Sequence, residues 1–403
     1  MIPARVLLAL AVGLCLYAYV GYPALVKVLS VLRRTRRSKP LIPDWPRISV
    51  ALPVYNEEHV IAGTLERILA LDYPADRRQI LVVSDASTDR THEIVSCFAH
   101  RGVELLCLPK RQGKTAAENA ARGHLTGEII INTDASVHIH PAAVKHLVAE
   151  FADPSVGVAS ARDISVANLG QQTNAGEETY VGYEMWTRDV ETALYGIVGA
   201  SGCLYAIRAE LHMRPVPEGL SRDFSAALTA RQYGRRAVSV PGALCYVPRS
   251  ASLHQEYRRK VRTITRGIAT LAHKRALLNP LRYGVFAWML FSHKVCRWLV
   301  PWALVSFLGA LGALALTSAW ARATLAGVAA LGVLAVIGWV WPEGRPMPRV
   351  LALPAYIAAG NVAVLQAWLR VLGGRPAPVW EPTRRGAMPA RYGRGEGRVD
   401  TAR

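Results

Sequence analysis

Long apolar runs lie towards both ends of the chain and enclose a middle part in which short apolar runs alternate with amphipathic helical patterns. Four runs of at least 20 residues contain no charged side chain, and they cover residues 6–26, 298–321, 323–342 and 350–369. Each is long enough to cross a hydrocarbon layer about 30 Å thick. The first run has no small-residue cleavage site behind a short apolar core, so we predict a retained membrane anchor over residues 1–32 instead of a signal peptide.

The charges that flank the first run predict the topology. A basic linker, residues 33–47, follows that run and begins with Arg33, Arg34, Arg36, Arg37 and Lys39. By the positive-inside rule this end of the first span faces the cytoplasm. The polar middle part is therefore expected in the cytoplasm, in a multi-pass protein of the inner (plasma) membrane.

The C-terminal part, residues 281–372, is expected to hold two or three membrane helices. Three full crossings would leave the basic tail, residues 373–403, on the far side of the membrane. The last apolar run also contains Pro354, Asn361 and Gln366, so a re-entrant or interfacial segment is an alternative to a full span. Gly, Pro and Arg dominate the tail, which we expect to be flexible.

Residues 48–250 have the pattern of an α/β domain. Apolar runs typical of strands cover residues 48–52, 79–84, 103–108 and 128–132, and Pro53 stops the first of them. Helical patterns follow each run, over residues 58–71, up to about residue 99, over 114–124 and over 141–151. This alternation predicts a parallel sheet. In open sheets of this kind, ligands bind outside the carboxyl ends of the strands.

The composition excludes several classes of protein. There are 48 Lys and Arg residues against 29 Asp and Glu, a net charge of +19, while 51% of the residues are hydrophobic. A disordered chain or a soluble nucleic-acid binder would carry such a charge on a far more polar sequence. The arginines that flank the spans account for much of the charge, so no nucleic-acid partner is expected. The six cysteines form no CxxC pair and are interpreted as small apolar residues in a reducing compartment.

Carboxylates follow three of the predicted strands. The loops are Pro53-Val-Tyr-Asn-Glu-Glu58, Ser84-Asp-Ala-Ser-Thr-Asp89 and Asn132-Thr-Asp-Ala-Ser136. Each acidic residue alone is explained by helix capping. Three at one edge of a sheet would repel each other unless a cation or a donor-rich ligand such as a nucleotide lay between them. The first strand is not followed by GxGxxG, which argues against a dinucleotide.

With these loops, the sequence resembles the family-2 glycosyltransferases, inverting enzymes with a Rossmann-like GT-A fold. The matching stretches are Val50-Ala-Leu-Pro-Val-Tyr-Asn-Glu-Glu58, Val82-Val-Ser-Asp-Ala-Ser-Thr-Asp89, Gln112-Gly-Lys-Thr-Ala-Ala-Glu-Asn119 and Thr133-Asp-Ala-Ser136, in the family's order. The resemblance covers roughly residues 48–267. The flanking membrane segments are similar to those of members that build bacterial exopolysaccharides.

The resemblance implies roles for particular residues in binding the donor. Tyr55, Glu57 and Asp85 would hold the nucleoside, with the two carboxylates accepting hydrogen bonds from uracil or ribose. Lys114 would lie near the diphosphate. Asp134 matches the first carboxylate of the family's DxD motif, which lies against the nucleotide-sugar diphosphate and its metal.

The second carboxylate of that motif is replaced by Ser136. A hydroxyl is a weaker ligand for Mg²⁺ or Mn²⁺ than a carboxylate, so Asp134 is the single expected metal ligand and metal dependence is an open question. His138 and His140 follow closely and are a candidate substitute, although exposed loop histidines are common.

The acceptor side of the resemblance centres on Ser221-Arg-Asp-Phe-Ser-Ala-Ala-Leu228. Asp223 falls where the family has its catalytic base, and Arg222 replaces an acidic residue common at the preceding position. A helix N-cap is the alternative interpretation of Asp223. Gly199 and Gly202 lie in a stretch similar to the family's acceptor-side segment, or else form an ordinary turn.

Residues 251–280 predict a basic amphipathic helix before the second span. Its apolar positions define one stripe, and its arginines occupy the neighbouring face, a pattern typical of contact with lipid headgroups: Leu253, Tyr257, Val261, Ile264, Ile268 and Leu271, beside Arg258, Arg259, Arg262 and Arg266. The resemblance implies a second use, because membrane-bound members have a QxxRW-type arginine here that meets the diphosphate. The chain lacks that motif, and we assign the clamp to Arg262 and Arg266.

The resulting hypothesis is a membrane-bound inverting glycosyltransferase that uses a UDP-sugar and a polysaccharide or lipid-linked acceptor. The alternative is a catalytically inactive membrane scaffold of a polysaccharide export complex, which Ser136 and Arg222 favour. Expected partners are the nucleotide-sugar, the acceptor, membrane lipids and export-complex subunits.

Overall fold

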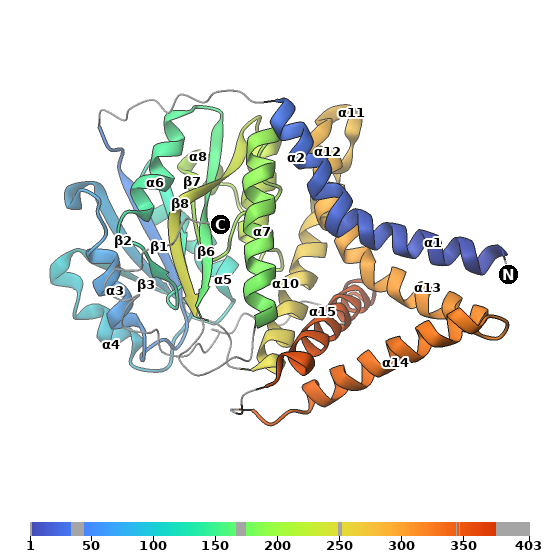
Figure 1. Cartoon of the computed structure of the whole chain (residues 1–403). Coiled ribbons are helices and arrows are strands. Elements are labelled where there is room, and N and C mark those ends of the chain that lie inside the picture. The colour runs from blue at the N-terminus through green and yellow to red at the C-terminus, as the bar shows by residue number, and fades with distance from the viewer. Residues whose placement is uncertain are drawn as a thin grey trace.

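The computed structural model describes residues 2–33, 44–166, 175–248, 252–343, 345 and 347–375. Most of the predicted basic linker and of the predicted flexible tail lies outside these residues. Figure 1 shows a sheet with its covering helices on one side, a group of long helices on the other, and α7 and α10 between them. The N-terminal end of α1 lies far from the sheet.

One mixed sheet organises the polar part of the described chain. Its strand order is β3-β2-β1-β4-β7-β6-β8-β5. The first four strands in that order are parallel, as the sequence predicts, but β7 runs antiparallel to both β4 and β6. The strands are β1 Ile48–Val54, β2 Arg78–Ser84, β3 Val103–Cys107, β4 Ile129–Thr133, β5 His138–Ile139, β6 Val156–Val166, β7 Leu204–Arg208 and β8 Arg236–Pro248.

Two apolar clusters cover the two faces of this sheet. In β1 successive side chains point to opposite faces, so Val50 and Leu52 pack with Leu65 of α3 on one side, while Ala51 packs with Ala117 of α5 on the other. The helices of this part are α3 Ile61–Leu69, α4 Thr91–Ser96, α5 Lys114–Ala121, α6 Ala143–Ala149, α7 Ala175–Leu194, α8 Ala209–His212, α9 Arg222–Gln232 and α10 Leu253–His273. Single 3₁₀ turns are Ala75–Arg77, Ala99–Arg101, Arg122–His124, Glu150–Ala152 and Arg275–Leu278.

The sequence predicts that the first strand stops at Pro53, but in the structure this strand continues to Val54. The pairing of β1 with β4 ends at Ala51, so beyond that point β1 has only β2 as a neighbour. Proline has no N–H to donate, and it is tolerated where one side of a strand is unpaired. The extension brings the loop after β1 level with the loop after β2.

Four helical segments of the described chain are long and apolar enough to cross a membrane: Ile2–Leu32, Val285–Ala315, Ala319–Trp339 and Arg349–Leu372. The first consists of α1 Ile2–Leu16, a π-helical turn η1 Tyr17–Gly21 and α2 Tyr22–Leu32. The second follows the short α11 Pro280–Tyr283 and consists of α12 Val285–Leu290, a π-helical turn η7 Phe291–Cys296 and α13 Arg297–Ala315. The others are α14 Ala319–Trp339 and α15 Arg349–Leu372.

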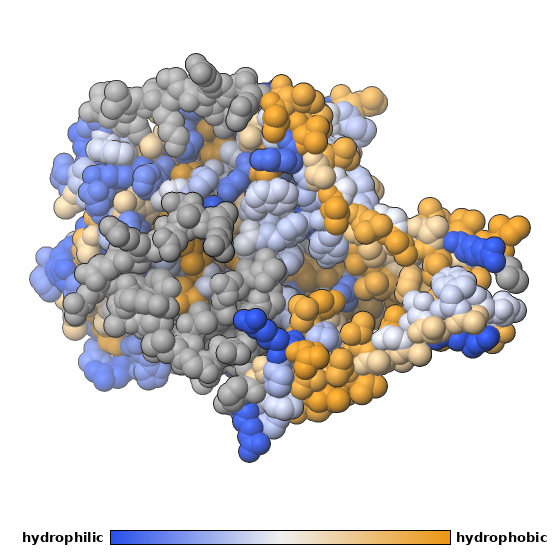
Figure 2. All heavy atoms as spheres, in the orientation of Figure 1, coloured by the Kyte–Doolittle hydropathy of each residue, from blue (hydrophilic) through white to orange (hydrophobic). Residues whose placement is uncertain are grey.

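The outer surface of this helix group is apolar, and Figure 2 shows it in orange around α1 and α14, in contrast to the blue surface over the sheet. α1 packs along α13, and α14 packs against α13 and α15. The exposed large hydrophobic residues are concentrated on these helices, as expected of surfaces that face lipid.

α10 lies between the sheet domain and the apolar helices, packing against α15 and α9. Val261, Ile268 and Leu271 of its predicted apolar stripe are buried. Arg258 points to solvent, whereas the other arginines of the helix are partly buried. The basic face of α10 is therefore mostly turned towards the protein.

Candidate functional site

The Asp85 carboxylate fastens the loop before α5 to the carboxyl ends of β1 and β2. Its two oxygens accept hydrogen bonds from the backbone N–H groups of Gln112 and Gly113, each at 2.7 Å. Its own N–H donates to the Val54 carbonyl at 2.9 Å. Gly113 has a φ of +96°, which favours glycine. Asp85 is fully buried, and here it holds the backbone that leads into Lys114.

Tyr55 and Glu57 lie in the loop after β1, beside Asp85, because β1 and β2 end in register. The guanidinium carbon of Arg111 lies 3.8 Å from the centroid of the Tyr55 ring, a cation–π contact. The Glu57 N–H donates to the Thr91 hydroxyl at 2.9 Å. The predicted nucleoside ligands thus gather at one end of the sheet, and their roles stay predictions.

Lys114, at the first position of α5, links Asp134 to the acceptor side. Its Nζ lies 2.5 Å from Oδ1 of Asp134 and 3.3 Å from the carbonyl of Gly202. Burial by itself disfavours the ammonium ion, but the nearby carboxylates of Asp134, Glu118 and Asp223 outweigh it and raise the pKa of Lys114. The side chain therefore stays positively charged at the centre of the site.

Asp223 lies in the first turn of α9, next to Gly202. The helix begins at Arg222 and Ser221 occupies the N-cap position, so Asp223 is not the cap itself. The Ser221 hydroxyl donates to the Asp223 carboxylate, and the Ser221 N–H donates to the hydroxyl of Thr270 in α10 at 2.9 Å. A Cβ on Gly202 would lie 2.8 Å from Oδ2 of Asp223, so the glycine gives this carboxylate room.

Arg222, which stands where the family has an acidic residue, points into the domain. Its Nη1 donates to the Asn119 side chain at 2.6 Å and its Nη2 to the His212 carbonyl at 2.9 Å. Its Nε lies 3.7 Å from the Glu118 carboxylate. Burial raises the pKa of Glu118, although Lys114 and Arg222 oppose the shift. The arginine ties α9 to α5 and accounts for this departure structurally.

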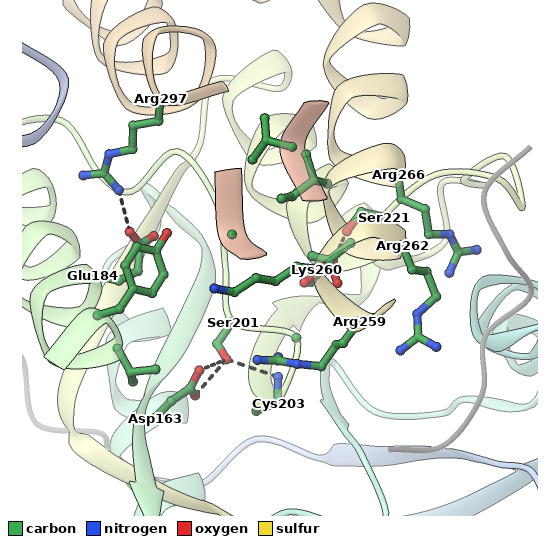
Figure 3. Close-up of a pocket in the computed structure, with 18 of the residues that line it drawn as sticks. Asp163, Glu184, Ser201, Cys203, Ser221, Arg259, Lys260, Arg262, Arg266 and Arg297 are labelled. Carbon is green, nitrogen blue, oxygen red and sulfur yellow. Dashed lines mark hydrogen bonds and ion pairs between the residues drawn. The ribbon is translucent and has the colours of Figure 1, made fainter. Parts of the chain in front are cut away.

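A cavity of about 810 Å³ connects these groups (Figure 3). Six of the predicted site residues line it: Lys114, Asp134, Gly202, Asp223, Arg262 and Arg266. Tyr55, Glu57, Asp85 and Gly199 are not part of the lining. Asp85 is joined to it through Gly113 and Lys114. A Cβ on Gly199 would lie 3.2 Å from the Phe224 ring, so that glycine serves helix packing.

The cations of α10 extend in two directions in Figure 3. Arg262 and Arg266 extend away from Lys260, and Nη2 of Arg266 donates to the Glu218 carbonyl at 2.5 Å. Arg259 and Lys260 extend the other way, towards Ser201. All four line the cavity, so α10 contributes cations to two different parts of the cavity.

Within the described ranges, no three His, Cys, Asp or Glu side chains come together in a way that could hold a metal ion. Asp134 is already paired with the Lys114 ammonium group. Burial and the nearby Arg67 lower the pKa of His138 to about 4, and Nδ1 of His140 accepts a hydrogen bond from the backbone N–H two residues on, at 3.2 Å. Neither histidine is thus brought into a metal-binding cluster with Asp134. The protein side chains described here do not by themselves form the predicted metal site.

A buried ionic network, which the sequence did not predict, joins α7 to the second span. His293 contacts Glu191 at 2.6 Å and Glu184 at 3.2 Å, and Arg297 donates to Glu184 at 2.8 Å. Tyr22 of α2 donates to Glu191 at 2.5 Å. Burial opposes ionisation of Glu184, but the surrounding cations hold its pKa well below the usual value. In the sequence these residues appear only as a cluster of basic residues at the start of an apolar run, which does not indicate their carboxylate partners in α7.

Comparison with known proteins identifies the sheet domain. The model of the family "Glycosyl transferase family 2" matches residues 49–212. The structure of the mannosyltransferase PcManGT from Pyrobaculum calidifontis, in complex with GDP-Man and Mn²⁺, has a TM-score of 0.69 and 25% sequence identity. That likeness covers 91% of this chain and 99% of the other. Together with the mixed sheet and the four apolar helices, it confirms the predicted fold class.

Curated relatives match over shorter stretches. A probable glycosyltransferase, YdaM, of Bacillus subtilis is 35% identical over 119 residues, 27% of this chain and 28% of that protein. The beta-monoglucosyldiacylglycerol synthase of Synechocystis sp. is 29% identical over 128 residues, 31% and 26% of the two chains. An undecaprenyl-phosphate 4-deoxy-4-formamido-L-arabinose transferase of Edwardsiella ictaluri is 34% identical over 115 residues, 28% and 35%. The matches thus span between 26% and 35% of these relatives' own length.

Proposed function

The chain belongs to glycosyl transferase family 2 through residues 49–212, and from this premise we propose that it is a membrane-bound inverting enzyme that moves a sugar from a nucleotide-sugar to a polysaccharide or lipid-linked acceptor. One observation carries the proposal. The Asp85 carboxylate holds Gly113, the next residue Lys114 contacts Asp134 and the Gly202 carbonyl, and Gly202 lies beside the Asp223 carboxylate. The proposed donor residues and the proposed base therefore lie in one continuous part of the molecule.

The donor is proposed to bind with its nucleoside at Tyr55 and Glu57, beside the backbone that the buried Asp85 carboxylate holds, and with its diphosphate at Lys114. Because Lys114 already neutralises Asp134, the incoming diphosphate needs further positive charge, which we assign to Arg262 and Arg266. Guanidinium groups bind phosphate oxygens in pairs and stabilise charge that develops on a leaving group. We propose UDP as the nucleotide. The neighbour solved with GDP-Man makes a guanosine nucleotide the competing candidate.

Asp223 is proposed to be the base of the transfer. Its carboxylate takes the proton from the acceptor hydroxyl while that oxygen attacks the anomeric carbon on the face opposite the diphosphate. The new bond joins the acceptor oxygen to the sugar, and the bond to the diphosphate breaks. A single carboxylate suffices, and the anomeric configuration inverts. The Ser221 hydroxyl donates to this carboxylate and orients it.

A bound Mg²⁺ or Mn²⁺ would have Asp134 as its one carboxylate ligand in this site and would need the donor for most of its remaining ligands. The steps proposed above therefore use only the cations of the chain. The membrane orientation, with the catalytic domain on the cytoplasmic face of the inner membrane, is part of the proposal and rests on the basic residues that follow the first span.

The competing function is an inactive scaffold of a polysaccharide export complex, which binds other subunits. Arg222 no longer favours it, since that residue has a packing role. Ser136 remains its support. The two functions differ in whether purified membranes turn over a donor at all.

The test uses membranes that contain the full chain, washed and incubated with labelled UDP- and GDP-sugars, with and without EDTA. We expect label to enter one product fraction from one donor, with inverted configuration in the product by NMR. Membranes with the Asp76→Asn variant, which changes an exposed acid remote from the cavity, should behave as wild type. If no donor yields product or free nucleotide, the scaffold function replaces the enzyme.

A further inference from the structure

The cavity that holds Asp223 continues into the membrane helices. Its lining includes Tyr19 of η1, Leu304 of α13, and Tyr356 and Val364 of α15, which belong to three of the four candidate spans. None of these side chains has a role in the donor binding proposed above. They form an apolar wall beside a site whose other wall is charged.

The apolar wall is open towards the outer surface of the helix group. Figure 2 shows that surface hollowed between α1 and α14, at the level where both are orange. Gly360 of α15 lines the same cavity. A Cβ on this residue would lie 3.4 Å from Lys260 Nζ, so the glycine leaves room beside the lysine. Asn361, the next residue, lines it as well. Polar groups at membrane depth commonly line a path for a ligand.

Where the apolar and charged walls meet, the cavity carries cations on different helices. Lys260 of α10 has its Nζ 3.7 Å from the centroid of the Tyr356 ring, and Figure 3 shows its side chain extending into the middle of the cavity. Arg188 of α7 lies 3.4 Å from Glu184 through its Nε. The Arg188 Nη1 is buried and has no hydrogen-bond partner among the described residues. Positive side chains outnumber carboxylates in the lining as a whole.

A buried guanidinium nitrogen without an acceptor is costly. The Glu184 carboxylate is shared with Arg297 and His293, and it contacts only the Nε of Arg188, so Nη1 stays without an acceptor in the part of the chain that the structure describes. A phosphate group supplies several acceptor oxygens and negative charge together, and arginine matches its geometry. The position of Arg188, beside an apolar wall built from spans, restricts that phosphate to a molecule that also has an apolar part.

We propose that the acceptor is a membrane lipid with a phosphate in its headgroup, which enters the cavity sideways from the bilayer between the first span and α15. Its chain lies against Leu304, Tyr356 and Val364, its phosphate binds Arg188 and Lys260, and its reacting hydroxyl reaches Asp223. This inference rests on the proposed glycosyltransferase function and narrows its acceptor. It assigns the two cationic groups of α10 separately, Arg262 and Arg266 to the donor and Lys260 to the acceptor.

The test uses the full chain reconstituted in phosphatidylcholine vesicles with lipids extracted from its host membranes, split by anion exchange into anionic and neutral fractions. We expect labelled sugar to enter a chloroform-soluble product only with the anionic fraction. Arg188→Gln and Lys260→Gln should each raise the KM for that fraction about tenfold, the loss of one hydrogen bond to a charged group, while the KM for the donor stays unchanged. The matched control Arg258→Gln removes an exposed charge from the same helix and should change neither constant.

A second variant tests the path without changing charge. Gly360→Leu fills the cavity beside Lys260 and should abolish transfer to lipid, whereas Gly332→Leu, on the exposed face of α14, should not. Binding without turnover is measured by native mass spectrometry in detergent with phosphatidic acid as the probe. Wild type should retain it, and Arg188→Gln should lose most of it.

Label in a water-soluble product, label in the neutral lipid fraction, or a raised donor KM in Arg188→Gln would each overturn the lipid-phosphate acceptor. A soluble sugar phosphate that serves as well as the lipid would show that the phosphate is recognised and the apolar wall is not used. Failure of the enzyme function itself is distinct, because wild type would then release no nucleotide with any donor and any fraction.

Discussion

The two halves of the cavity are built in different ways. The proposed donor half combines Lys114 and Asp134, which line the cavity, with the loops that directly follow β1 and β2, which lie outside the lining and are held by side chains such as Asp85. The acceptor half is formed by α7, α10, α13 and α15, which come from distant parts of the chain and meet through buried ions. The first half is readable as motifs because each loop is local to a strand. The second depends on how helices pack.

The variant Asp223→Asn should have the largest effect, because it removes the proposed base at the point where the two halves meet. Loss of general-base catalysis costs about 10²- to 10⁴-fold in rate. Transfer is measured with labelled donor and donor affinity by calorimetry. A normal turnover rate in this variant would remove Asp223 from the mechanism.

The variant Glu184→Gln tests the acceptor half as a folded unit. Breaking a buried ion pair by removing one partner costs about 3–5 kcal/mol, so the thermal unfolding temperature in detergent should drop clearly. The matched change Glu93→Gln breaks the exposed Arg90 pair, for which no measurable shift is expected. Equal unfolding temperatures for both variants would mean that the network does not hold α7 to α13.

The same network gives a pH dependence. The folded-state pKa of Glu184 lies below its usual value, so its stabilising contribution is complete above about pH 4.3 and is lost as the pH falls through the folded pKa. Acid titration of unfolding should show this loss in wild type and not in Glu184→Gln. Loss of stability at alkaline pH instead would contradict the assignment.

The variant Lys114→Gln tests the donor half and should weaken donor binding about tenfold, the loss of one charge-assisted hydrogen bond. Lys110→Gln, an exposed change in the preceding loop, is the control. The raised pKa of Lys114 keeps its ammonium charged as the pH rises past the usual lysine value, about 10.4. The charged state would be contradicted if wild type lost donor affinity at a pH well below about 10.4 through a deprotonation that Lys114→Gln does not show.

The variant Ser136→Asp should have the smallest effect. It restores the second carboxylate of the motif, and added ligand charge strengthens binding of divalent cations. The Mn²⁺ concentration for half-maximal donor binding should decrease, with Ser136→Asn as the neutral control. No change would mean that residue 136 does not face the diphosphate.

Sequence patterns brought together the residues of the proposed donor half for a physical reason. A buried parallel strand needs a continuous apolar run, and the residues just after it lie at the end of the sheet wherever that sheet packs. Asp85 and Asp134 were therefore found together without any knowledge of side-chain contacts. The mixed character of the sheet escaped prediction, because the direction of β7 depends on the path that the chain takes before it.

The acceptor half had no comparable signal. Arg222 reads as a lost acidic residue, yet its contacts to Asn119 and His212 make it a structural link. His293 and Arg297 read as residues at a membrane boundary, yet they bind Glu184, more than 100 positions away in the chain. Pairings at such separations follow from helix packing and leave no local pattern.

The sequence by itself determined the apolar spans, the α/β order and the acidic loops at the strand ends, because hydrophobic periodicity and strand–loop adjacency are properties of neighbouring residues. Tertiary structure alone decided that α10 turns Lys260 towards one half of the cavity and Arg262 towards the other, and that Arg188 is buried beside the membrane helices. The direction of these side chains depends on which faces of the helices pack together, and the burial of apolar surface between distant segments determines that packing.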